Sequence, residues 1–269
     1  MNPGISNFLP TFESTHATSL SYERLKVEIY RDKETAGAAG AAIAAEEIRS
    51  MLVRRPEASV ILASAVSQDS FLAALRAHGD IEWNRITVFH LDEYAGMSPN
   101  HPASFRRYLR ERLLDHVPVR AFHQLNGEAK DLQIECKRYS ALLREAQPAL
   151  VALGIGENGH LAFIDPHSCN FNDTEDVRVV ELDDVCRLQQ VHDAAFKRLE
   201  DVPRAALSLT VPLFLRIPRA LVFVVGQNKA VAVKAALEGP LSETCPASAL
   251  RQHPNATMFL DQAAAAGLN

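Results

Sequence analysis

Short apolar runs alternate along this chain with longer segments whose apolar positions have helical spacing. The first run covers residues 26–30, and an alanine-rich helical pattern over residues 35–54 follows it. Six further runs predict strands at residues 58–64, 85–91, 148–156, 205–211 and 219–226, and at a last segment that ends near Asp261. Strands that alternate with helices predict an α/β fold. We expect a Rossmann-like three-layer sandwich with a mostly parallel central sheet.

Composition indicates a globular protein with one large domain. The chain has 269 residues, of which 47% are hydrophobic and 23% charged, and its net charge is -5. No repeat, low-complexity linker or charge block divides it, so we predict one domain over residues 26–269 after a loosely structured arm at residues 1–25. The weak negative charge gives no electrostatic reason to expect nucleic acid or a membrane surface as a partner.

Targeting signals and cysteine usage both point to the cytoplasm. The N-terminal sequence lacks a basic region followed by an apolar core, so it does not read as a signal peptide. No run approaches the roughly 18 apolar residues that a membrane span needs. The cysteines show no metal-binding spacing, and incidental thiols in a reducing compartment are the simplest interpretation; they are Cys136, Cys169, Cys186 and Cys245.

Polar and ionisable residues follow the carboxyl ends of several predicted strands. In open parallel sheets, ligands bind at this edge because backbone groups are free there. The segments in question are AVSQDS after 58–64, DEYAGMSPNHP after 85–91, GENGHLAFIDP after the strand in 148–156 and GQNKA after the strand in 219–226. The opposite strand ends lack this density, so we expect the functional site at the carboxyl edge.

The stretch LGIGENGHLAFIDP at 153–166 places His160 after three glycines and five residues before Asp165. Glycine permits a tight turn, and Asp165 could hold one ring nitrogen while the other remains free for proton transfer. The alternative is a loop histidine satisfied by backbone carbonyls. The strand-end position and the nearby carboxylates favour the chemical role.

Asp92 and Glu93 come directly after the strand at 85–91. A carboxylate at the rim of an apolar interior gains basicity from desolvation, whereas its structural alternative is to cap the following loop. Adjacent side chains on an extended segment point to opposite sides. We therefore expect only one of the two carboxylates to face the site.

Two segments suggest an anion site. Ser64, Ala65 and Ser67 belong to a segment, SAVSQDSF, that resembles a phosphate cradle of hydroxyl and N–H groups, although a plain helix cap at Ser67 explains it equally well. Lys229 lies at a predicted helix start, where a lysine is unfavourable beside the helix dipole unless an anion binds there. Exposure to solvent is its structural alternative.

Together these motifs resemble the glucosamine-6-phosphate deaminase/isomerase family, which shares its fold with 6-phosphogluconolactonases. The resemblance runs from about residue 58 to residue 261. It rests on HLDEYAGMSPNHPASFRRYL, GIGENGHLAFIDP and VVGQNKAVAVKAALEG, in that order. The Asp-Glu-Tyr form favours the deaminase branch, because lactonases usually carry Asp-Glu-Arg at this place.

The resemblance implies a substrate, a reaction and residue roles. The substrate would be a 2-amino-2-deoxyhexose 6-phosphate, converted to fructose 6-phosphate and ammonia without a metal or organic cofactor. His160 would open the sugar ring, and Asp165 would orient it. Asp92 would take the C2 proton and return it to C1 through an enolamine, while Lys229 would bind phosphate.

The sequence also departs from the family pattern. Asn158 replaces the usual aspartate two residues before the histidine, as it does in relatives described as galactosamine-6-phosphate isomerases, so the galacto epimer stays open. Residues 65–68, AVSQ, replace the Gly-Gly-Thr-Pro phosphate loop. The usual phosphate arginine falls near His192, and Arg187 is close enough in sequence to substitute for it.

Three functions follow from these observations. We expect an aldose–ketose isomerase with deamination. A sugar-phosphate lactonase would use His160 to activate water and would leave Asp92 without a proton to transfer. A non-catalytic sugar-phosphate sensor would explain Asn158 and the altered loop, but binding alone needs no base. The partner would be a small sugar phosphate, and the sequence is compatible with a homo-oligomer.

Overall fold

The computed structural model describes residues 16–269, and in this range the chain forms two sheets. The central sheet has eight strands, in the spatial order β1 (His16–Tyr22), β2 (Leu25–Tyr30), β11 (Ala256–Asp261), β10 (Arg219–Val224), β7 (Leu150–Leu153), β3 (Ala58–Leu62), β4 (Ile86–His90) and β6 (Ala121–His123). Only the β1–β2 pair is antiparallel. The predicted α/β fold with a mostly parallel sheet is confirmed.

Strand order creates a crevice between β3 and β7. From β3 the chain moves outward to β4 and β6, and it then returns to β7 and moves the other way to β10 and β11. The loops after β3 and β7 therefore leave neighbouring strands in opposite directions. Such a switch point is where open parallel sheets bind ligands.

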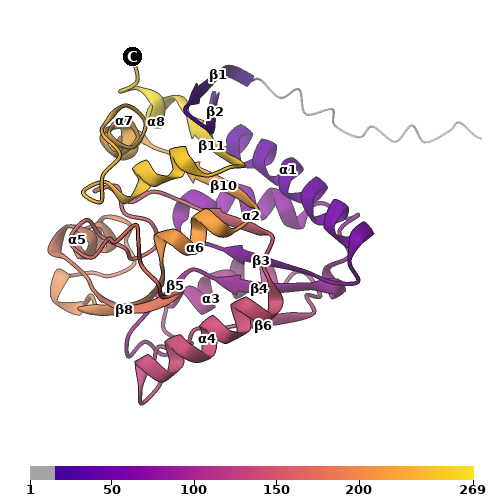
Figure 1. Cartoon of the computed structure of the whole chain (residues 1–269), viewed down its shortest axis with the longest axis vertical. Coiled ribbons are helices and arrows are strands. Elements are labelled where there is room, and N and C mark those ends of the chain that lie inside the picture. The colour runs from indigo at the N-terminus through magenta and orange to yellow at the C-terminus, as the bar shows by residue number, and fades with distance from the viewer. Residues whose placement is uncertain (1–15) are drawn as a thin grey trace, which may run out of the picture.

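Helices cover both faces of the central sheet. Helices α1 (Lys33–Arg54) and α2 (Asp69–Arg76), with the π-helical turn Arg110–Leu114 that continues α3 (Phe105–Leu109), share one apolar cluster. The helices of the other cluster are α4 (Leu132–Ala146), α5 (Asp184–His192), α6 (Val211–Arg216), α7 (Ala230–Glu238) and α8 (Gln262–Ala265) (Figure 1). Strand β10 alternates accordingly: Leu221 and Phe223 face the first cluster, and Val222 faces the second.

Local sequence explains the first long helix. Asp32 caps α1: its side chain accepts a hydrogen bond from the Thr35 N–H at 2.8 Å, in a capping box. Small residues then let the helix approach the sheet closely. A Cβ at Gly40 would lie only 2.2 Å from the Phe223 ring, so this position tolerates no side chain.

The structure adds to the strand predictions at two places. Residues 16–22, assigned to the loose arm at 1–25, form β1, because Leu20 and Tyr22 pack against the core beside β2 and β11 (top of Figure 1). Residues 1–15 of that arm lie outside the described residues. The run at 205–211 forms β9 (Ala205–Leu209), which belongs to the smaller antiparallel sheet with β5 (Asp92–Tyr94) and β8 (Val177–Glu181) instead of the central one.

None of the helices among residues 16–269 is long and apolar enough to cross a membrane.

Candidate active site

A cavity of about 310 Å³ opens at the carboxyl edge, over the switch point. Its walls come from the loops after β3, β4 and β7, the start of α7 and the end of α5. The predicted residues that line it are Ser64, Ala65, Ser67, Asp92, His160 and Lys229. Segments far apart in sequence thus meet in one cavity, and its size suits a small polar metabolite.

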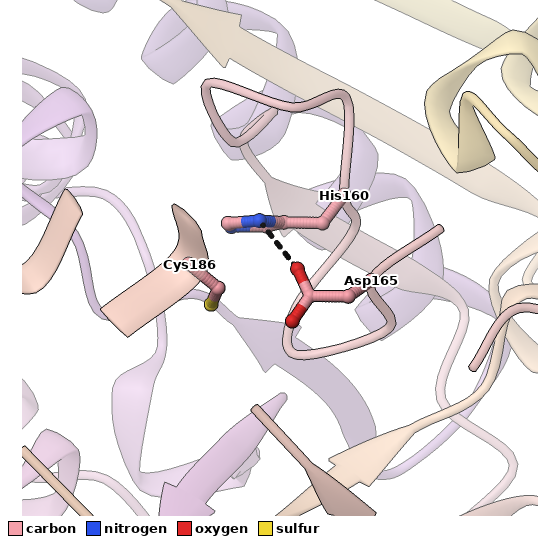
Figure 2. A group of neighbouring side chains, drawn as sticks. All are labelled: His160, Asp165 and Cys186. Atoms are coloured by element: carbon pink, nitrogen blue, oxygen red, sulfur yellow. Dashed lines mark ion pairs between the residues drawn. The ribbon is translucent and has the colours of Figure 1, made fainter. Parts of the chain in front are cut away.

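His160 and Asp165 form a buried pair at the base of this cavity. The His160 Nδ1 atom lies 3.1 Å from Asp165 Oδ1, although the ring N–H direction falls outside hydrogen-bonding geometry. Figure 2 shows the imidazole extending above the carboxylate. His160 lines the cavity and Asp165 lies fully buried behind it. This arrangement leaves the second ring nitrogen as the one for a bound ligand.

Asn158 ties this pair together. Its side-chain amide donates to Asp165 Oδ1 at 3.0 Å, and its carbonyl oxygen accepts from the His160 backbone N–H at 3.0 Å. Burial alone raises the pKa of Asp165, but the His160 imidazole, the Asn158 amide and the Asp183 N–H together hold that pKa below its usual value. Asn158 therefore supports an ionised Asp165, where an aspartate would repel it.

Glycine at 156 and 159 is required by close approach and by backbone shape. A Cβ at Gly156 would lie 2.1 Å from the His160 ring. Gly159 has a φ of +84°, in the left-handed region that favours glycine. Phe163 is buried and packs on Tyr94 and Phe105, with ring centroids 5.1 and 5.5 Å apart, so the loop rests on an apolar base.

Asp92 faces the cavity, and Glu93 points the other way. Among the described residues, none donates a hydrogen bond to the Asp92 carboxylate, which is only 7% exposed. Burial, and then the charge of Glu93, raise the pKa of Asp92 well above its usual value. Glu93 instead accepts from Arg106 Nε at 2.9 Å and from the Ser104 hydroxyl at 2.7 Å. Glu93 is thus held by buried hydrogen bonds, whereas the Asp92 carboxylate faces the cavity.

Lys229 is a buried cation that lines the cavity. Burial lowers the pKa of Lys229, while Asp193 and Glu157 oppose that shift. Within residues 16–269 its ammonium has neither a hydrogen-bond acceptor nor an ion-pair partner, although burial of an unpaired charge is costly. The Ser67 hydroxyl accepts from Gln68 at 3.1 Å, and the Ser64 hydroxyl donates to the Phe105 carbonyl at 3.2 Å.

Two predicted anion-binding residues lie elsewhere. The Arg187 guanidinium is buried and donates to Asp184 at 2.8 Å and to the Leu199 carbonyl at 2.7 Å, so it anchors the segment after α5. His192 lies half exposed, with Nδ1 3.5 Å from a Glu157 oxygen. Neither residue lines the cavity. Their position in sequence was a poor guide because α5 turns these side chains away.

The structure also adds residues that the sequence analysis missed. Tyr108 and Arg112 line the cavity, and so do Gln189, Gln190 and Asp193 near the end of α5. Tyr108 and Arg112 are four residues apart and therefore share a helical face, which was a usable signal. The α5 residues carried none, because that segment contains no motif.

The donor set around His160 does not favour a metal. The side chains of His160, Asp165 and Cys186 are neighbours (Figure 2), and their potential ligand atoms lie within 4.8 Å of one another. Burial, together with Asp165, raises the pKa of the Cys186 thiol far above its usual value. A metal would have to displace this proton, since metals bind the thiolate. We assign Cys186 to the packing behind the pair.

Comparisons with known proteins agree with this geometry. Residues 31–259 match the model of a family described as glucosamine-6-phosphate isomerases/6-phosphogluconolactonase. A glucosamine-6-phosphate deaminase of Bacillus cereus (strain B4264) and one of Bacillus thuringiensis (strain Al Hakam) are each 38% identical over 184 residues, 68% of either chain.

Solved structures give the same picture. A monomeric glucosamine-6-phosphate deaminase superposes with a TM-score of 0.82 at 31% identity, covering 90% of this chain and 99% of that one. The 6-phosphogluconolactonase of Trypanosoma brucei reaches 0.75 at 19% identity, covering 93% and 100%, and shows the fold alone. This chain belongs to the glucosamine-6-phosphate isomerase/6-phosphogluconolactonase family.

Proposed function

We propose that this protein is an enzyme that converts glucosamine 6-phosphate, or its galacto epimer, to a ketose 6-phosphate and ammonia. The observation that carries the proposal is the unpartnered Asp92 carboxylate, which shares one cavity with the His160–Asp165 pair and with Lys229. Relatives named glucosamine-6-phosphate deaminase support the same reaction. The residues divide into a base, a ring-opening group and an anion anchor.

The reaction begins with opening of the sugar ring. The His160 imidazole takes the proton from O1 and delivers it to O5, which breaks the C1–O5 bond and gives the open-chain aldehyde. Asp165 holds Nδ1, so the other ring nitrogen carries this proton. Because Gly156 has no side chain, its backbone can lie against the His160 imidazole without displacing it.

Asp92 then performs the isomerisation. Its carboxylate removes the C2 proton while a proton reaches O1, which gives the enolamine. The carboxylate then returns its proton to C1 and the nitrogen loses one proton, which leaves a hydroxyl at C1 and an imine at C2. Water adds to this imine, and ammonia leaves as the ketose forms. A raised pKa suits a base that must hold a proton between two carbons. In a lactonase this buried carboxylate would have no proton to move.

A parallel assay tests the proposal. We expect ammonia release from glucosamine 6-phosphate or from galactosamine 6-phosphate and no hydrolysis of 6-phosphogluconolactone. Hydrolysis of the lactone without ammonia release would establish the lactonase instead. Binding of all three compounds without turnover would establish the sensor. The ratio of kcat/KM for the two amino sugars assigns the epimer, because both contain the same leaving group.

Lys229→Ala is expected to raise KM for the amino-sugar phosphate strongly and to lower kcat by a smaller factor. The buried ammonium loses its favourable contact with the phosphate, and remote binding energy also helps to orient the reacting carbons. Steady-state kinetics against Lys234→Ala provide the check, because Lys234 lies on the same α7 helix, pairs with Glu238 at 2.6 Å and lines no part of the cavity. An unchanged KM would move the anion site away from Lys229.

We further propose that the enzyme works in the cytoplasm on a small sugar phosphate, and that it binds neither nucleic acid nor a membrane surface. The net charge of -5 supports the exclusion of nucleic acid and of a membrane surface, because both are polyanionic. The Bacillus relatives carry names that refer to small metabolites.

A further inference from the structure

Two basic side chains, Lys229 and Arg112, line the described cavity. A phosphate monoester carries about -1.5 to -2 charges near neutral pH. The cavity also contains the carboxyl groups of Asp92 and Asp193. One lysine therefore leaves a bound phosphate undercompensated, and a second cation is needed close to it.

Arg112 is held in position beside the loop at 64–67. Its Nε donates to Asp69 Oδ1 at 3.0 Å, and its guanidinium carbon lies 5.1 Å from the centroid of the Tyr108 ring. The Tyr108 hydroxyl in turn lies 2.6 Å from the Ala65 carbonyl oxygen and 2.6 Å from Asp69 Oδ1. Arg112, Tyr108 and the loop thus form one linked unit at the cavity wall.

The outer end of the guanidinium remains available. Arg112 Nη1 lies 3.6 Å from a Glu111 oxygen, and no acceptor among residues 16–269 takes a hydrogen bond from either terminal amino group. The side chain is 44% exposed, and Arg112 is one of the residues that line the cavity. A guanidinium fixed at Nε and open at its terminal nitrogens matches the geometry of a phosphate.

We propose that Arg112 is the second phosphate contact of this protein and takes the place that sequence position suggested for Arg187 or His192. The phosphate would lie between Arg112, the Ser67 hydroxyl and Lys229. Asp69 would be a positioning residue, because it touches the guanidinium and lines no part of the cavity. This inference rests on the proposed function.

Inorganic phosphate tests the contact without turnover. The thermal midpoint of the full chain is measured as phosphate replaces chloride at constant ionic strength, because a ligand that binds the folded state raises that midpoint. We expect Arg112→Ala to weaken the apparent phosphate affinity about tenfold or more, the effect of losing hydrogen bonds to a charged group. Arg112→Lys keeps the positive charge but loses the paired N–H donors of the guanidinium, so its phosphate affinity should lie between those of Arg112→Ala and the unmodified protein.

Arg107→Ala is the matched control. Arg107 lies on the same helical segment, is 40% exposed, pairs with Glu111 at 2.6 Å and lines no part of the cavity. We expect its phosphate affinity to stay within about twofold of that of the unmodified protein, since exposed charges are screened by salt. An equal loss of phosphate affinity in both variants would indicate a general electrostatic effect and would overturn the proposed contact. An unchanged affinity in Arg112→Ala would overturn it too.

Kinetics separate this inference from the proposed function. With an amino-sugar phosphate, Arg112→Ala should raise KM about tenfold relative to Arg107→Ala, with kcat less affected. Where inorganic phosphate alone leaves the thermal midpoint unmoved, this ratio of KM values decides for or against Arg112. Phosphate binding that depends on Arg112 in a protein that releases no ammonia would uphold the anion contact and refute the deaminase.

Discussion

Asp92→Asn is expected to lower kcat by about 10²–10⁴-fold while leaving substrate affinity within a few fold. The amide has the shape of the carboxyl group and no basicity, so the C2 proton stays on carbon. A residue that only capped the following loop would tolerate this change, because Asn caps as well as Asp does. Near-normal turnover would therefore refute the isomerase mechanism. Glucosamine 6-phosphate kinetics, with galactosamine 6-phosphate in parallel, provide the measurement.

The same variant should be more stable than the unmodified protein at neutral pH. The pKa of Asp92 is raised in the folded state, mainly by burial and then by Glu93. A raised pKa means that the folded state favours the protonated form, so this stabilisation is present below the unfolded pKa and is lost as pH rises through the folded pKa. Thermal midpoints of the two proteins should differ at neutral pH and converge in acid.

Two further observations bear on Asp92. Because the base must be ionised, kcat/KM should fall on the acid side at a higher pH than an ordinary aspartate would give. In deuterated water, a single shielded base should carry part of the C2 hydrogen to C1. Complete exchange with solvent would argue against one enclosed carboxylate as the carrier.

His160→Gln should also lower kcat by about 10²–10⁴-fold, because proton transfer to O5 is lost. Asp165→Asn should also lower kcat by slowing ring opening, since the amide no longer holds the His160 imidazole at Nδ1. If the two residues act as one unit, the double variant should be about as slow as His160→Gln alone. Losses that multiply would show that Asp165 acts independently of the imidazole.

Substitution of Asp92 and of Asp165 by Asn should shift the thermal midpoint in opposite directions. The pKa of Asp165 is lowered in the folded state, since the His160 and Asn158 contacts outweigh burial. That stabilisation is present above the unfolded pKa and is lost as pH falls through the folded pKa. Asp165→Asn should therefore lower the thermal midpoint at neutral pH, whereas Asp92→Asn should raise it.

Much of the fold could be predicted because its signals are local. The run at 219–226 and the helical pattern after it reappear as β10 and α7, and the alternation along β10 shows why a strand covered on both faces reads as continuously apolar. The cleft was predictable for a related reason. Parallel strands bring their carboxyl ends to one edge, so His160, Asp92 and Lys229 were expected at that edge, where the structure places all three in one cavity.

The residue pattern was enough to predict the layer architecture, the edge that carries the site and the glycine-lined position of His160. It did not show that Arg187 anchors a loop, that Arg112 faces the cavity or that 205–211 joins the smaller sheet. The difference lies in how far apart along the chain the interacting residues are. Periodicity and strand ends report contacts within one element, whereas the direction of a side chain on α5 or the partner of β9 depends on packing between segments that are distant along the chain.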